Sequence, residues 1–334
     1  MGKLNLARRI RNCFLLALVS LWLTACASSS GLESGLYKID AGPHAVTIAN
    51  DIVLADPVHE RDVSFRVLFP DAGGSYPVVV HSHGGSCKPE NYDLFLAHWA
   101  SHGYIVIAPN HPDSLNSAQP PTPEVWATIV PRRLRDLSFA LDALDEITAA
   151  AAIPGQANAA SVAVTGHSFG AGMALMKSGM FILDEYRAPW SRGYDERFRA
   201  GIYFSAPGGN EPGNPDDALD GLTLPFMATG GSKDQGRLDP GDMSLADFRR
   251  QVFLRAPAGD KYSVILEDAD HYLGGLICNP ERGGKPDPEA VAIINAMTTA
   301  FLDAYLKQDA PAKSFLASDD AVRLTDGRAD YRRR

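Results

Sequence analysis

Short apolar runs and longer amphipathic stretches alternate along most of this chain. The clearest helical spacing lies within 132–147, where Leu134, Leu137 and Leu141 recur every three or four residues. The short runs are rich in β-branched residues, as strands are. This alternation favours a doubly wound, mostly parallel α/β sheet with helices on both faces. The predicted strands are 46–54 and 63–69, which form an opening antiparallel pair, then 77–81, 104–108, 162–165, 201–205, 224–229 and 262–266, and the predicted helices are 91–102, 132–147, 171–176 and 289–306.

A sharp turn between a predicted strand and a predicted helix carries the first candidate for chemistry. The strand ends at Thr165, and the following Gly166-His-Ser-Phe-Gly170 places Ser168 at the apex of the turn. This pattern is the nucleophile elbow, in which glycines let the strand and helix backbones come close together. We therefore predict that Ser168 is a catalytic nucleophile. The alternative is an ordinary strand–helix turn.

A serine nucleophile needs a base and an acid that orients the base. In chains with this elbow the order is serine, then acid, then histidine. His271 is the only histidine after Ser168 and follows the last predicted strand of the parallel series, so it is the candidate base. The candidate acid is Asp234, just beyond the penultimate of these strands, and Glu211 after the preceding strand is the alternative.

Two backbone N–H groups are candidates for stabilising an oxyanion. The N–H of Phe169 lies at the start of the helix that follows the elbow, where the helix dipole favours negative charge. The second donor is assigned to Gly85 in the turn His83-Gly-Gly85, because small residues there let the backbone approach a substrate. The alternative is a glycine-rich turn without function.

The first 25 residues have the pattern of an export signal. Four basic residues and no acid lie within 1–11, and the apolar run 14–23 is short for a membrane span. The segment ends in Leu23-Thr-Ala-Cys26, which resembles the lipobox of bacterial lipoproteins, so Cys26 is predicted to be lipidated. Ala27 stands where aspartate would favour inner-membrane retention, which indicates an outer-membrane anchor. A plain secretory signal is the alternative.

Charge and composition limit the function classes. Removal of residues 1–25 takes away four positive charges and changes the formal net charge from −9 to −13, which argues against a nucleic-acid partner. A chain that is 45% hydrophobic and 21% charged is typical of a single globular domain. We predict a tether over 26–36, a catalytic domain over 37–310 and a polar, solvated C-terminal tail over 311–334. The oligomeric state stays open.

Four motifs stand out within residues 60–308. They are His81-Ser-His-Gly-Gly85, the segment 99–108, Arg135-Asp-Leu and Gly166-His-Ser-Phe-Gly170. Together they resemble the dienelactone hydrolase and platelet-activating-factor acetylhydrolase branch of the α/β hydrolases. The resemblance implies the α/β-hydrolase fold and a serine hydrolase that needs no cofactor.

One position departs from this branch. Animal-type acetylhydrolases place their acid in a segment similar to Gly201-Ile-Tyr-Phe-Ser-Ala-Pro207, where this chain has Ser205. The departure favours Asp234 as the acid, which is the placement in dienelactone-hydrolase-like and cutinase-like relatives. It also weakens any transfer of phospholipid specificity.

We therefore predict a carboxylic ester hydrolase, similar to carboxylesterases and lipases, that forms an acyl-enzyme on a small or lipid-like ester. Alternatives on the same fold are a thioesterase, an amidase or a dienelactone-type hydrolase. An alternative from another class is a non-catalytic cell-envelope binding protein, which would not need all three catalytic groups in order.

The two cysteines of the folded part are predicted to be bonded. The α/β-hydrolase topology places Cys87 and Cys278 on loops at the active edge, and an exported chain meets an oxidising compartment. Two unpaired cysteines are the alternative, because the sequence alone does not fix the distance between their Cα atoms.

Three further patterns have either a functional or a purely structural interpretation. His81, His83 and His111 suggest metal ligands, but the acidic neighbours of a metallo-hydrolase are missing, so no metal is expected. The long connections 110–131 and 181–198 are either partial lids or ordinary surface loops. Lys177 and the arginines of 132–147 are expected to form a solvated face.

Overall fold

The computed structural model describes residues 37, 40–58, 60–117, 122–181, 193–207 and 216–334. The predicted export signal, the tether and Cys26 lie outside the described residues, and no described helix is both long enough and apolar enough to cross a bilayer. The strands are β1 (Val46–Asp56), β2 (Arg61–Pro70), β3 (Ser75–Ser82), β4 (Ile105–Pro109), β5 (Gln156–His167), β6 (Phe198–Phe204), β7 (Phe226–Lys233), β8 (Lys261–Asp270) and β9 (Ala329–Arg333). The helices are η1 (Pro89–Tyr92), α1 (Asp93–Ser101), α2 (Pro123–Ala127), α3 (Ile129–Asp142), α4 (Leu144–Ala150), α5 (Phe169–Lys177), α6 (Leu245–Arg255), α7 (Pro288–Leu306), α8 (Ala310–Leu316) and α9 (Asp320–Leu324).

All nine strands of the described residues form one sheet, in the order β1-β2-β4-β3-β5-β6-β7-β8-β9. Strands β3 to β8 run parallel to one another. Strand β2 pairs antiparallel with both β1 and β4, and β9 pairs antiparallel with β8. The predicted antiparallel opening and the mostly parallel α/β sheet are therefore confirmed. Because parallel strands end at the same edge of a sheet, the loops after β3, β5, β7 and β8 lie close together.

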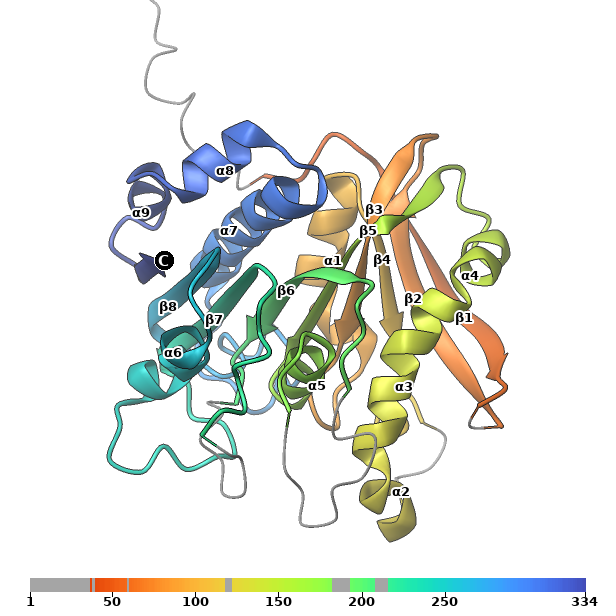
Figure 1. Cartoon of the computed structure of the whole chain (residues 1–334), viewed down its shortest axis with the longest axis horizontal. Helices are drawn as coiled ribbons and strands as arrows, with labels where there is room; N and C mark the ends of the chain where they lie inside the picture. Colours follow the sequence, from red (N-terminus) through yellow and green to blue (C-terminus); the bar gives the residue numbers. More distant parts are fainter. Residues whose placement is uncertain (1–36, 38–39, 59, 118–121, 182–192, 208–215) are drawn as a thin grey trace, which may run out of the picture. The chain divides into compact units, whose positions relative to one another are not determined.

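Helices cover both faces of the sheet, because neighbouring residues of each buried strand point to opposite sides. Val78 and Val80 of β3 belong to the apolar cluster that includes α3, α4, α5 and α6. Val79 belongs to the other cluster, which includes α1, α7, α8 and α9. Figure 1 shows α3, α5 and α6 on the near side of the strands. The loops after β3, β5, β7 and β8 therefore extend from a sheet that is packed on both faces.

Residues 311–334 do not form the predicted solvated tail. The chain continues through α8 and α9 into β9, which extends the sheet beside β8. Tyr331 donates a hydrogen bond to the Leu316 carbonyl 2.7 Å away, and Asp330 forms an ion pair with Arg250 of α6. The prediction was wrong because charged residues at the end of the chain suggested solvent, whereas an edge strand also accommodates outward charges.

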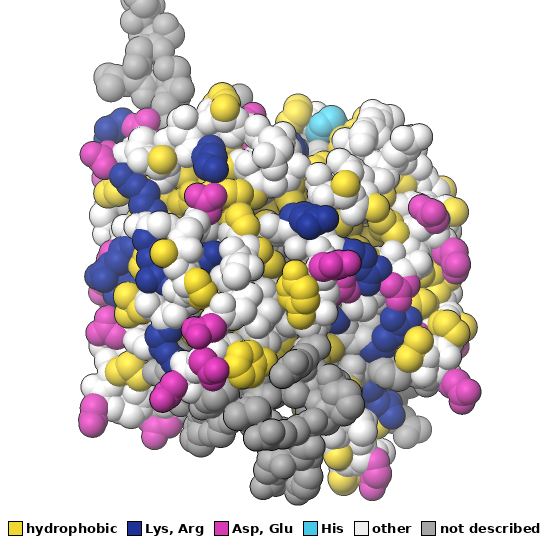
Figure 2. Space-filling view, viewed as in Figure 1, with side chains coloured by type: hydrophobic (Ala, Val, Ile, Leu, Met, Phe, Trp, Pro, Cys, Tyr) yellow, Lys and Arg dark blue, Asp and Glu magenta, His cyan; other side chains and the backbone are white. Residues whose placement is uncertain are grey.

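The basic residues of α3 and α5 do not all form the predicted solvated face. Arg133 is fully buried and pairs with Asp113 at 2.7 Å. It lies four residues before Leu137, on the inward side of α3, where the carboxylate offsets the cost of burying its charge. Burial also lowers the pKa of Lys177 to about 8. Other charged side chains stay outside, and Figure 2 shows basic and acidic groups interspersed on one face.

Candidate active site

The elbow between β5 and α5 holds Ser168 in a strained backbone conformation. Its φ of 54° and ψ of −118° lie outside the regions that residues with side chains usually adopt. A Cβ on Gly166 would collide with the Gly170 carbonyl, and a Cβ on Gly170 would collide with the Ser82 carbonyl. These two close approaches explain why both positions are glycine. The tight turn presents the Ser168 side chain at the edge of the sheet.

The structure brings the three predicted catalytic side chains together. Asp234 directly follows β7, and His271 directly follows β8. The His271 Nε2 atom lies 2.9 Å from Ser168 Oγ, and its Nδ1 atom lies 2.5 Å from Asp234 Oδ1. Ser168 is half-buried, whereas His271 and Asp234 are buried. The alternative acid, Glu211, lies outside the described residues.

Asp234 is held as a carboxylate by its surroundings. Burial raises the pKa of this carboxyl, but the hydrogen bond from His271 and the charge of Arg249 outweigh burial and lower the pKa to about 2. The Arg249 Nη2 atom lies 3.0 Å from Asp234 Oδ1. The same guanidinium donates to the carbonyls of Ser205 and Ala206 at 3.1 and 2.9 Å. The sequence does not single out Arg249, because its contact with Asp234 depends on how α6 packs beside the loop after β7.

A buried hydrogen-bond chain joins the glycine turn after β3 to the histidine loop. The Gly84 N–H donates to the Tyr92 hydroxyl at 2.9 Å, and that hydroxyl lies 2.8 Å from His167 Nδ1. On its other side, His167 Nε2 lies 3.0 Å from the His271 carbonyl. Burial, followed by the nearby His271, holds the pKa of His167 well below its usual range. A neutral His167 therefore accepts from Tyr92 and donates to the His271 carbonyl.

The two predicted oxyanion donors lie on neighbouring turns. Gly85 and Phe169 line the same cavity as Ser168 and His271. A Cβ on Gly85 would lie 3.6 Å from the Phe169 Cβ, so the two segments are in contact range. Because the Gly84 N–H already donates to Tyr92, Gly85 is the residue of this turn that we assign to the oxyanion.

The cavity at Ser168 has a volume of about 530 Å³. Basic side chains also line this cavity, among them Arg237 and Arg282 from the loops after β7 and β8. Trp126 of α2 belongs to the predicted lid segment 110–131, whereas much of the second predicted lid, 181–198, lies outside the described residues. The apolar wall is formed by Trp126, Val130, Phe169, Met173, Met176, Met180 and Pro207.

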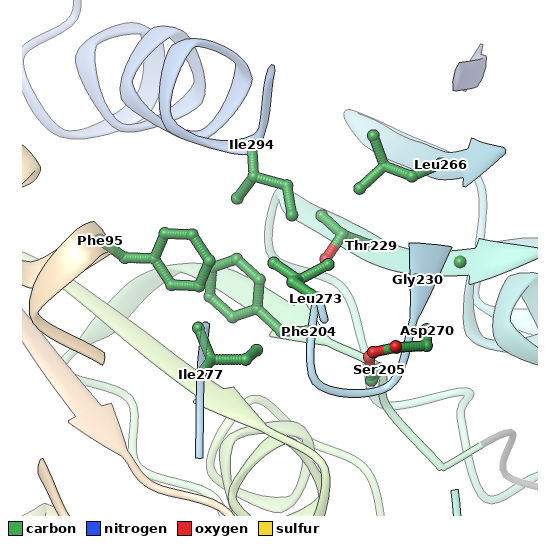
Figure 3. A pocket seen from close by; sticks show the side chains of 11 residues that line it. Phe95, Phe204, Ser205, Thr229, Gly230, Leu266, Asp270, Leu273, Ile277 and Ile294 are labelled. Carbon is green, nitrogen blue, oxygen red and sulfur yellow. The ribbon is translucent and has the colours of Figure 1, made fainter. Parts of the chain in front are cut away.

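A second, much smaller cavity of about 10 Å³ lies inside the fold beside the catalytic loops. Figure 3 shows the stacked rings of Phe95 and Phe204 on one side and the side chains of Ser205 and Asp270 on the other. This volume is about that of one water-sized probe, so it cannot hold an ester substrate. Asp270 instead orders the histidine loop, since it accepts backbone hydrogen bonds from Tyr272, Gly274 and Gly284 at 2.8 to 3.0 Å.

Cys87 and Cys278 are disulfide-bonded in the structure, with 5.1 Å between their Cα atoms. The bond joins positions 191 residues apart. Cys87 follows the Gly85 turn, and Cys278 lies in the loop after His271. The disulfide therefore ties the turn that contains Gly85 to the loop that follows His271.

The histidines of the metal alternative contact protein groups. His81 Nδ1 lies 2.8 Å from Thr165 Oγ1, and His83 Nδ1 lies 2.8 Å from the Gly84 carbonyl. His111 lies between Ser82 and Asp136. Within the described residues, no group of His, Cys, Asp and Glu side chains is placed to hold a metal ion.

The sheet order, the elbow and the Ser–Asp–His order are together those of the α/β-hydrolase fold. Residues 39–178 match the family model described as Chlorophyllase. A 43-residue segment is 44% identical to "Chlorophyllase type 0" of Chenopodium album and covers 13% of this chain and 12% of that protein. A 58-residue segment is 40% identical to "Chlorophyllase-1" of Arabidopsis thaliana and covers 16% of this chain and 18% of that protein.

The similarity to chlorophyllases covers part of the site only. The segment matched by the family model contains Gly85, Ser168 and Phe169 but ends before Asp234 and His271. It supports the predicted superfamily, whereas the family matched is chlorophyllase and not the dienelactone hydrolase or acetylhydrolase branch suggested by the motifs. These matches give no support for the predicted lipoprotein.

Proposed function

We propose that this chain is a serine-dependent carboxylic ester hydrolase. The observation that carries the proposal is the hydrogen-bonded series Ser168, His271 and Asp234, of which Ser168 and His271 line a 530 Å³ cavity. Hydrogen-bond contact between nucleophile and base, and between base and acid, is the geometry that acyl transfer requires. The sequence similarity to chlorophyllases supports an ester as the bond cleaved.

The reaction starts when Ser168 Oγ attacks the ester carbonyl carbon and passes its proton to His271 Nε2. Asp234 holds the Nδ1–H of the imidazolium that forms, and the N–H groups of Gly85 and Phe169 donate to the oxyanion. Collapse of this intermediate releases the alcohol, which takes the proton from His271. Water then gives a proton to His271 and attacks the acyl-enzyme, and the carboxylic acid leaves as Ser168 regains its proton.

The cavity wall supports an ester with a large apolar group. Met173, Met176 and Met180 are flexible side chains that adapt to irregular apolar shapes. The cavity volume lies within the range of small-molecule sites. Because the matched relatives carry the name chlorophyllase, chlorophyll esters are natural first substrates, together with esters of long-chain acids.

The test is hydrolysis by the purified domain of chlorophyll a, of p-nitrophenyl esters from acetate to palmitate, and of a matched acyl thioester and anilide. We expect hydrolysis of at least one ester class, with kcat/KM rising as the apolar group grows until the cavity is filled. Absence of turnover on all esters by folded protein would refute the proposal. Preference for the thioester or the anilide would move the function to the thioesterase or amidase alternative.

We also propose that the domain is exported and anchored through a lipid on Cys26, on the evidence of the lipobox-like Leu23-Thr-Ala-Cys26. Expression in a bacterial host with labelled palmitate should give a membrane-associated, labelled protein. Cys26→Ala should abolish label incorporation and release the protein. A labelled Cys26→Ala variant, or an unlabelled wild type, would contradict the anchor.

A further inference from the structure

We propose that Arg133 and Asp113 are positioning residues that set the direction of the oxyanion-binding N–H groups. The proposal rests on the function proposed above and concerns a buried ion pair that has no contact with the three catalytic side chains. Arg133 and Asp113 are 0% and 2% exposed, so neither group meets substrate.

Arg133 holds the carbonyl groups of the turn after β3. Its Nη1 atom donates to the His83 carbonyl at 2.6 Å, and its Nη2 atom donates to the Gly84 carbonyl at 3.1 Å. The Gly84 C=O and the Gly85 N–H belong to one planar trans peptide unit, so they point in opposite directions. Because Arg133 holds the Gly84 carbonyl toward its guanidinium, the Gly85 N–H of the same peptide unit points away from Arg133.

Asp113 fixes the next peptide unit. Its carboxylate receives two hydrogen bonds from the Arg133 guanidinium, at 2.8 and 2.7 Å, and one from the Ser86 N–H at 3.0 Å. Burial raises the pKa of the Asp113 carboxyl, but the charge and hydrogen bonds of Arg133 outweigh it and lower the pKa. Asp113 therefore stays ionised. Both peptide units that contain Gly85 are thus anchored from outside the turn.

The same guanidinium contacts the second donor residue. The Arg133 Cζ atom lies 4.7 Å from the centre of the Phe169 ring, a geometry typical of cation–π contact. One buried cation consequently touches the turn of Gly85 and the residue that supplies the other N–H. Asp113 neutralises the charge of Arg133. The proposed role of Arg133 is therefore to orient the N–H groups and not to stabilise the charge of the tetrahedral intermediate.

The precision of this placement matters because misplacement of a reacting or stabilising group by about 1 Å can lower a rate about 10²-fold. A loosened turn should weaken only the interactions that form in the tetrahedral intermediate. The histidine loop is linked to this turn through Tyr92, His167 and the disulfide, but it also has anchors outside the turn. Arg249 pairs with Asp234, and Asp270 accepts backbone hydrogen bonds of the histidine loop, so the base and acid should keep their positions when the Gly85 peptide units loosen.

The matched control is Arg135 on the same helix. Its Nη2 and Nε atoms donate to Asp56 Oδ1 at 2.9 and 3.0 Å, which are close to the Arg133–Asp113 distances, but among the described residues it contacts none of the turn His83-Gly-Gly85. Arg135→Lys therefore removes a comparable fork-shaped contact from α3 without touching the donors.

The experiment compares Arg133→Lys, Asp113→Asn and Arg135→Lys with the wild type on an ester that the wild type hydrolyses. For Arg133→Lys we expect kcat about 10²-fold lower, KM within threefold, and a parallel loss of affinity for an alkyl boronic acid, which forms a tetrahedral adduct with serine. Asp113→Asn should give about a tenfold loss of the same kind. The pH profile of kcat should keep its shape, and Arg135→Lys should stay within threefold of wild type.

A folded Arg133→Lys variant with unchanged kcat and boronic acid affinity would overturn the inference. A displaced pH profile would also overturn it, because it would show that Arg133 acts through the base. If Arg133→Lys does not fold, Asp113→Asn decides, since it keeps the shape of the side chain. If the wild type cleaves no ester, the proposed function fails instead, which separates the two outcomes.

Discussion

Two Ser–His–Asp hydrogen-bond series lie in the described part of the chain, and a comparison of them shows which features set the proposed nucleophile apart. In the first, His271 lies 2.9 Å from Ser168 and 2.5 Å from Asp234. In the second, His111 lies 2.9 Å from the Ser82 hydroxyl and 2.8 Å from Asp136. We call them the elbow series and the buried series.

The chemical contacts of the two series are closely alike. Each aspartate also pairs with an arginine, Asp234 with Arg249 and Asp136 with Arg61. Burial, followed by the charge of Arg133, holds the pKa of His111 well below its usual range, so this histidine is neutral and its Nε2 atom accepts a hydrogen bond from the Ser82 hydroxyl. Distances alone therefore do not distinguish the two series.

Access and backbone geometry distinguish them. Ser82, His111 and Asp136 are all 0% exposed, and Ser82 lies within the regular strand β3. Ser168 lies on a strained turn at the wall of a 530 Å³ cavity, beside the N–H groups of Gly85 and Phe169. A serine becomes a nucleophile toward an external ester when a substrate can reach it and donors face the developing charge. We therefore interpret the buried series as structural.

Removal of each serine hydroxyl should separate the series most strongly. Ser168→Ala should lower kcat by a factor on the order of 10⁴ or more, because no other group replaces the nucleophile. Ser82→Ala should leave kcat within a few-fold but lower the free energy of unfolding by about 1–3 kcal/mol, since the buried His111 Nε2 atom loses its hydrogen-bond partner. Steady-state kinetics and urea unfolding of both variants measure this. Equal losses of kcat would break the distinction.

The aspartates should show the next largest contrast. Asp234→Asn should lower kcat on the order of 10³ to 10⁴, because the amide no longer fixes the His271 tautomer. Asp136→Asn should act on stability, with a loss of about 3–5 kcal/mol expected for a broken buried ion pair. The kinetic assay and thermal unfolding distinguish these effects. If Glu211→Gln lowers kcat more than Asp234→Asn does, the acid is instead Glu211, which follows the predicted strand 201–205.

The disulfide lies next to the elbow series, since it joins the turn that contains Gly85 to the loop that follows His271. Replacement of Cys87 and Cys278 by serine should lower the free energy of unfolding by about 2–5 kcal/mol, because the bond closes a long loop. It should also lower kcat modestly, since the oxyanion turn and the histidine loop lose their covalent link. Urea unfolding of oxidised, reduced and double-variant protein provides the measurement. Indistinguishable midpoints would remove the structural role of the bond.

As the pH falls, protonation of the buried histidines should be the first cause of lost folding stability. Burial lowers the pKa of His81 and of His83 to about 3, and the pKa values of His111 and His167 are also held well below the usual 6.5. These residues stay neutral in the fold but bind protons when unfolded, so stability is full above pH 6.5 and falls as pH drops toward 3. Each contributes a slope of about 1.4 kcal/mol per pH unit. A melting temperature that stays constant from pH 7 to 5 would contradict this.

The sequence predicted those features that depend on local pattern and chain order. Ser168 was predictable because the elbow is a local motif. His271 was predictable because it is the only histidine after Ser168 in the sequence. Asp234 followed from its place after a buried strand. The central sheet was predictable for the same reason, since its strands are apolar and bounded by turns.

The features that escaped prediction depend on packing between distant segments. Arg249 reaches Asp234 only because α6 packs beside the loops after β6 and β7. Arg133 was predicted to be a surface residue because it is charged. It is buried because Asp113, twenty residues earlier in the sequence, pairs with it, and the sequence pattern does not show this pairing. Strand β9 was missed because its charged positions do not show that it pairs with β8.

The most direct test of the central claim is covalent labelling of the folded domain with a fluorophosphonate, followed by peptide mass spectrometry. The account predicts one adduct, on Ser168, that is retained in Ser82→Ala and lost in Ser168→Ala. An adduct on Ser82 or on another serine, or no adduct on folded wild-type protein, would contradict the assignment of Ser168 as the nucleophile.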